Sequence, residues 1–78
     1  MKYSGTIEEL TGYGPMLLSR LDPKEYFSLQ HAIDDFKAEA ELAYVENFLG
    51  QTKIIQAYIY SEKLGILEKI IRLKFGQH

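Results

Sequence analysis

His31 and Asp35 suggest metal binding at first sight, because residues four positions apart share one face of a helix. Asp34 stands beside them, so the group supplies at most two neighbouring ligands, whereas a structural metal site needs about four that converge. The Glu-x-x-His pattern of di-iron bundles is missing, because Ser28 stands three residues before His31. We therefore expect a hydrated histidine with an acidic neighbour, and no metal or other cofactor.

The serines and carboxylates lack the context that catalysis requires. Nucleophilic catalysis needs a base and an oxyanion hole beside the hydroxyl group, and no serine stands in a G-x-S-x-G or S-x-x-K motif. Asp34 and Asp35 are adjacent on the polar side of a predicted helix, where both should be hydrated. Cysteine is absent, which excludes a thiolate nucleophile, Cys-ligated zinc and disulfides. We predict that the protein is not an enzyme.

Two patterns raise the question of phosphate or nucleic-acid binding. The glycine-rich TGYGP segment, residues 11–15, lacks the G-x-x-x-x-G-K-[ST] pattern of a phosphate loop and follows no clear strand, so we interpret it as a connector. Lys69, Arg72 and Lys74 form a small basic group near the C-terminus. They suit the C-terminal dipole of a helix, and they also support an alternative function, that of a small DNA-associated regulator.

Length and composition restrict the class of protein. The chain has 78 residues, of which 46% are hydrophobic and 26% charged, as expected for one globular domain spanning residues 1–78. No apolar run reaches the roughly 20 residues that span a bilayer, and the N-terminus lacks the apolar core of a signal peptide. We therefore expect a soluble, cytoplasmic protein without a transmembrane segment.

The charges are unevenly distributed along the chain. Residues 22–49 carry seven acidic and two basic side chains, whereas residues 50–78 carry two acidic and five basic ones. An acidic segment followed by a basic one suits two helices folded back on each other. The acidic segment also disfavours nucleic acid as a partner.

The first part of the chain is predicted to form two short helices. Thr6 and Glu9 form a capping-box pattern, which predicts a helix near residues 7–12. The glycines of the connector end it, and residues 15–21 are interpreted as a second short helix. Residues 1–21 would thus form a short N-terminal helical unit.

The strongest helix signal lies in the DPKE segment. Asp22 is interpreted as an N-cap, Pro23 as the first helical residue and Glu25 as the partner in a capping box. Apolar residues then recur at spacings of three and four until Gly50, which can end a helix. This spacing predicts a long helix over residues 23–49.

The segment QTKIIQAYIY, residues 51–60, fits either a helix or a strand. Its β-branched and aromatic residues favour a strand, and its alternation is partial. A strand needs a partner, and the other candidate strand, MKYSGTI, is short and weakly patterned. We therefore favour a helix over residues 51–75. The predicted fold is all-α, a small helical bundle in which the N-terminal unit packs on an antiparallel hairpin of two long helices, residues 22–78.

The predicted hairpin cannot cover all of its apolar surface. The uncovered residues would form a patch larger than soluble monomers tolerate, so we expect a homodimer of hairpins, a larger protein partner, or both. Tyrosines suit such an interface, because the ring can be buried while the hydroxyl group stays hydrated. The predicted interface residues are Leu42, Tyr44, Val45, Leu49, Ile54 and Tyr58.

The expected function is that of a small non-catalytic protein-binding module, an adaptor, inhibitor or regulator of a larger protein. A long acidic helix followed by AYIYSEKLGIL is similar to small helical proteins of unknown function from bacterial and phage genomes. This resemblance covers part of the chain, contains no specific motif and implies no activity. Regulators carried by phages and other mobile elements are often built at this size, which is an analogy of architecture.

Overall fold

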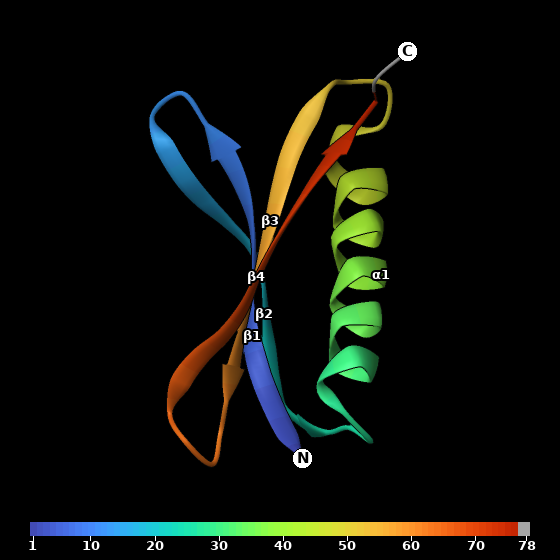
Figure 1. Ribbon diagram of the computed structural model, residues 1–78. Helices are drawn as coiled ribbons and strands as arrows, with labels where there is room; N and C mark the ends of the chain where they lie inside the picture. The colour runs from blue at the N-terminus through green and yellow to red at the C-terminus, as the bar shows by residue number, and fades with distance from the viewer. Residues whose placement is uncertain (77–78) are drawn as a thin grey trace.

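The computed structural model describes residues 1–76, which form a four-stranded antiparallel sheet with one helix packed against one face (Figure 1). The elements in chain order are β1 (Lys2–Thr11), β2 (Gly14–Glu25), α1 (Leu29–Phe48), β3 (Lys53–Ser61) and β4 (Ile66–Phe75). The strand order is β2-β1-β3-β4, so β1 and β3 are central and β2 and β4 are the edges. Neither α1 nor any other described segment is a helix long and apolar enough to cross a membrane.

The predicted all-α fold is wrong. Residues 7–12 belong mostly to β1, residues 15–21 belong to β2, and most of residues 51–75 form the β3–β4 hairpin. The short helical unit at residues 1–21, the helical hairpin at 22–78 and the helical bundle are therefore all replaced by a sheet with one covering helix.

The alternation of buried and partly exposed residues in β1 shows why the helix predicted near residues 7–12 is wrong. Tyr3 and Ile7 are buried under α1, whereas Ser4 and Thr6 point to the other face, which is the period of a half-covered strand. Polar residues and Gly5 dilute this pattern in the sequence. The presumed capping residue Thr6 instead donates a hydrogen bond to Glu8 within the strand (3.0 Å).

The segment of uncertain type is the central strand β3. Ile55, Ala57 and Ile59 are buried beneath α1, while Tyr58 and Tyr60 lie on the opposite face. A central strand with apolar residues on both faces shows no clear alternation, which is why the pattern was ambiguous. The missing partner strand is β1, which pairs with β3 from Tyr3–Ser61 to Glu9–Ile55.

The predicted long helix exists but begins later, at Leu29. Its N-cap is Ser28, whose hydroxyl oxygen accepts a hydrogen bond from the backbone N–H of His31 (3.2 Å). Asp22 and Pro23 lie in β2, an edge strand, where a proline is tolerated because its missing N–H group faces no neighbour. The same residues therefore satisfied a helix-start pattern while belonging to a strand.

The core lies between α1 and the sheet. Phe36 is fully buried at its centre, and the other buried helix residues are mostly alanines, which allow α1 to lie close to the strands. Gly5 makes this approach possible in β1, since a Cβ atom there would collide with the carbonyl oxygen of Tyr58 and lie 2.7 Å from the ring of Phe36.

Candidate binding face

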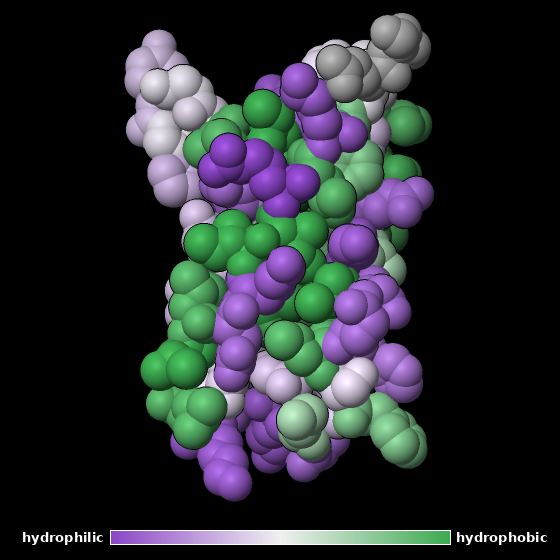
Figure 2. Space-filling view, in the orientation of Figure 1, coloured by the Kyte–Doolittle hydropathy of each residue, from purple (hydrophilic) through white to green (hydrophobic). Residues whose placement is uncertain are grey.

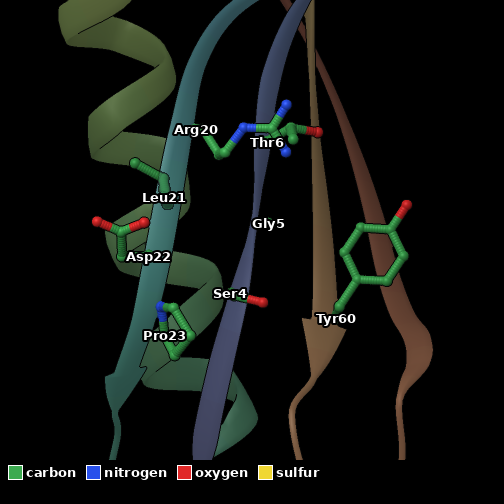
Figure 3. Close-up of a pocket in the computed structure, with 8 residues that line it drawn as sticks. All are labelled: Ser4, Gly5, Thr6, Arg20, Leu21, Asp22, Pro23 and Tyr60. Atoms are coloured by element: carbon green, nitrogen blue, oxygen red, sulfur yellow. The ribbon is translucent and has the colours of Figure 1, made fainter.

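The face of the sheet opposite α1, called the open face below, is the candidate functional surface. Directly opposed residues of antiparallel strands share a face, so the register places their side chains together. Thr6 lies opposite both Arg20 of β2 and Tyr58 of β3, and Tyr58 in turn lies opposite Ile70 of β4. Figure 3 views the sheet from this side, with α1 behind the strands.

A hollow of about 210 Å³ opens on this face over β2, β1 and β3. Figure 3 shows the side chain of Arg20 extending toward Thr6, with the ring of Tyr60 standing beyond them on β3. Ser4, the cross-strand partner of Tyr60, presents its hydroxyl group toward β3. The remaining lining residues are Gly5, Leu21, Asp22 and Pro23. Small-molecule pockets usually start at about 300 Å³, so this hollow suits one projecting group of a larger partner.

The two arginines of the open face are held differently. Among the salt bridges of residues 1–76, none involves Arg20, so its guanidinium group remains available to a carboxylate or phosphate. Arg72 of β4 donates two hydrogen bonds to the side-chain oxygen of Gln56, from Nη2 at 2.9 Å and from Nε at 3.1 Å. Gln56 is 3% exposed, so this fork fixes Arg72 against β3 and leaves further N–H groups free to bind.

The hydroxyl groups near the hollow are oriented by carboxylates. Ser4 donates a hydrogen bond to Glu62 (2.5 Å), and Thr6 donates one to Glu8 (3.0 Å). A hydroxyl that donates to a carboxylate still has lone pairs with which to accept from a ligand. Both hydroxyls are therefore set to accept hydrogen bonds, which suits an N–H or O–H group of a partner.

A group of exposed apolar side chains, called the hairpin patch below, adjoins the open face. It lies at the β3–β4 turn and the nearby part of both strands, where Figure 2 shows hydrophobic surface at the lower left. Each of its side chains is between 39% and 61% exposed. The hairpin patch consists of Tyr60, Leu64, Ile66, Leu67 and Ile70.

Charge is divided between the helix and the rest of the chain. The helix α1 carries five acidic side chains and one basic one, whereas the remaining residues carry six acidic and eight basic ones. The sheet side is therefore the less negative side of the molecule. A partner with acidic groups meets less repulsion at the open face than at α1.

The structure does not bring the predicted interface residues onto one surface. Leu42 and Val45 are exposed on α1 and Leu49 is exposed at its C-cap, whereas Ile54 and Tyr58 belong to β3 on the other side of the sheet. Tyr44 is in the core, where its ring stacks on Phe75 (centroids 4.9 Å apart) and its hydroxyl group donates to the carbonyl oxygen of Gln51 (2.6 Å). These residues were grouped by helical spacing, which does not apply to β3.

The predicted basic group is divided between the two faces of β4. Lys69 lies opposite Ile59, on the face that α1 covers. Arg72 and Lys74 lie opposite Gln56 and Ile54, on the open face. Alternation in a strand separates Lys69 from Arg72, whereas a helix would have placed these two residues, three positions apart, on one side.

The pair that suggested metal binding has a structural role. Asp35 accepts a hydrogen bond from the hydroxyl group of Tyr26 (2.5 Å) and lies 3.8 Å from the ammonium group of Lys24. His31 instead contacts the ring of Phe27 edge-on. Burial, with a smaller contribution from Asp35, raises the pKa of Tyr26 well above its usual range. Residues 1–76 contain no group of three or more potential metal ligands.

Sequence reasoning missed the residues of the hollow. Ser4, Thr6, Arg20 and Tyr60 come from three strands, and they meet only because β1 pairs with β2 on one side and β3 on the other. The one sequence signal was the alternation of β1, where the small polar residues Ser4 and Thr6 alternate with buried positions. Comparison of the chain with protein-family models, curated proteins and solved structures gave no match.

Proposed function

We propose that this protein is a non-catalytic binding module that docks a protein partner on the open face and the hairpin patch. The observation that carries the proposal is the placement of Tyr58, Tyr60, Arg20 and Arg72 on one face of the sheet that α1 does not cover. Tyrosine and arginine are the residue types that dominate protein interfaces energetically. The open face thus replaces the helical face expected from the sequence.

The hollow gives this docking surface a specific feature. Its size favours one side chain of the partner, and the free guanidinium group of Arg20 favours a carboxylate on that side chain. The ring of Tyr60 and the apolar hairpin patch would bury the surroundings of that ion pair. Such partial desolvation strengthens an arginine–carboxylate contact.

Affinity capture from the native host, with matched variants as bait, tests the proposal. Tyr60→Asp and Arg20→Ala should each lose the specific partner, whereas Val45→Asp on the exposed side of α1 should retain it. All three positions are exposed, so the variants should stay folded, which circular dichroism checks. Loss of the partner from Val45→Asp alone would move the binding surface to the helix and refute the proposal.

A second candidate function is the binding of single-stranded nucleic acid. It is favoured by the aromatic pair on central strand β3, Tyr58 and Tyr60, with Arg72 and Lys74 on the same face. Aromatic side chains stack on bases, and basic ones contact phosphates. Carboxylates at the same face oppose this function. They belong to Glu8, Asp22 and Glu62.

An oligonucleotide titration separates the two candidates. A fluorescent oligothymidylate and a random duplex would be titrated with the protein at about 50 mM and about 200 mM salt. Tight, salt-sensitive binding of the single strand that Tyr58→Ala abolishes would favour nucleic acid over protein. Absence of binding at the lower salt concentration would remove this candidate.

A further inference from the structure

We propose that β4 pairs with β4 of a second copy of this chain, so that two sheets join edge to edge into one eight-stranded antiparallel sheet. The proposal concerns the edge of the sheet and does not rest on the proposed use of the open face. It would bring the open faces of both copies onto the same side of one continuous surface.

The two edges of the sheet are protected to different degrees. The edge strand β2 contains Pro15 and Pro23, and its pairing with β1 is shifted at two places. Proline and bulges are the usual means by which proteins prevent edge-to-edge pairing. The other edge, β4, is ten residues long, contains neither proline nor glycine, and has one shift, near its start. The regular part of β4, from Lys69 to Phe75, therefore offers free backbone groups to an incoming strand.

The side chains of β4 support an apolar neighbour. Ile66, Leu67 and Ile70 are each about half exposed. On the helix side, a groove of about 390 Å³ runs between α1 and β4, and it is lined in part by Ile33 and Leu73. A strand added beside β4 would cover both sets of apolar atoms.

The charge pattern of β4 favours a second copy as the added strand. A symmetric antiparallel pair must place one residue opposite its own copy, and the residues on either side then oppose each other in order. With Ile71 at the axis, Arg72 faces Ile70 of the partner and Leu73 faces Lys69 of the partner, all within the regular part of β4. No like charges are opposed in this register. Placing the axis at the next residue would set Arg72 against its own copy.

The small core gives such pairing an energetic reason. Helix α1 contributes mainly alanines to the core, and the chain has no disulfide to add stability. Domains of this size are usually supplemented by oligomerisation when disulfides and metals are absent. We assign the axis to Ile71 because this register opposes no like charges and keeps the contact between Ile70 and Arg72 within the regular part of β4.

The sign of a charge introduced at position 70 tests both the pairing and its register. Sedimentation velocity over about 1 μM to 1 mM protein should show a reversible monomer–dimer equilibrium for the unmodified chain. Ile70→Lys would place lysine opposite Arg72 at two symmetric positions, and it should weaken the dimer at least about tenfold. Ile70→Glu would place a carboxylate opposite the same arginine, and it should retain the dimer within about threefold.

The control is Val45→Lys, because Val45 and Ile70 are both 47% exposed and lie on opposite sides of the molecule. This variant should dimerise like the unmodified chain. A monomer over the whole concentration range, or loss of the dimer from Val45→Lys, would overturn the proposal. Equal weakening by Ile70→Lys and Ile70→Glu would overturn the register, because a residue that faces its own copy is repelled by either charge.

Discussion

At the scale of single residues, the structure depends on one close approach at Gly5. A side chain at this position of β1 would meet the carbonyl oxygen of Tyr58 on β3 and the ring of Phe36 from α1. Backbone atoms of a central strand cannot move aside cheaply, and the core ring is fully buried. At Gly5, therefore, the β1–β3 pairing and the packing of α1 on the sheet both depend on the absence of a side chain.

Gly5→Ala should destabilise the protein by about 2 kcal/mol or more, because the added methyl group overpacks the centre of the core. Gly12→Ala is the control, since a Cβ atom there would have nothing within 4 Å, and its effect should stay within about 0.5 kcal/mol. Urea unfolding followed by circular dichroism measures both. Equal stability of the two variants would show that β1 and β3 can separate at Gly5.

Single residues also explain why the candidate site was not predictable. Arg20 and Thr6 carry no motif, and their proximity follows from the register of β1 with β2. That register contains two shifts, so even a correct assignment of both strands would not have paired these residues. Tyr58 was predicted as an interface residue from helical spacing, and its position on the open face follows instead from its pairing with Thr6 in the sheet.

At the scale of elements, one of the four predicted helices is present in the residues that the structure describes, and its start was misplaced by several residues. The DPKE pattern and Ser28 both fit the chemistry of an N-cap, and local sequence does not rank them. The choice is made by β2, which extends to Glu25 because Lys24 and Glu25 pair with β1. Tertiary pairing thus overrides a good local signal.

Ser28→Ala should lower the free energy of unfolding by about 1 kcal/mol, because it removes the oxygen that accepts from the N–H group of His31. Asp22→Ala should change it by less than about 0.5 kcal/mol, since Asp22 is exposed in β2 and caps nothing. Thermal unfolding of the two variants side by side measures the difference. A larger loss of stability from Asp22→Ala than from Ser28→Ala would support the helix start predicted from the sequence.

The β3–β4 hairpin was not predicted, because the apolar residues of this segment fit the period of a helix as well as that of a strand. Residues 51–75 place apolar side chains on most positions, so a wide helical stripe and a pair of strands explain them equally well. Gly65 carries the decisive local information, because its φ of 66° closes the turn between β3 and β4. In the sequence the same glycine was compatible with a kink in a helix.

At the scale of the whole molecule, the fold is held by contacts between the two ends of the chain. Tyr3 pairs with Ser61, and α1 covers strands that come before and after it. The central strands have neighbours on both sides, whereas β2 and β4 each have one. Local stability should therefore be highest in β1 and β3 and lowest at the edges, unless an edge is covered by another copy.

Amide hydrogen exchange at two protein concentrations would reveal this order. In dilute protein, amides of β1 and β3 should exchange slowest, and those of β2 and β4 that face outward should exchange at least about tenfold faster. At high concentration, the outward amides between Lys69 and Leu73 should become protected, while those of β2 should not change. This difference between the two edges follows from Pro15 and Pro23, which hinder the pairing of another strand with β2 and have no counterpart in β4. Protection that rises equally at both edges, or at neither, would contradict the edge pairing while leaving the central β1–β3 ladder unaffected.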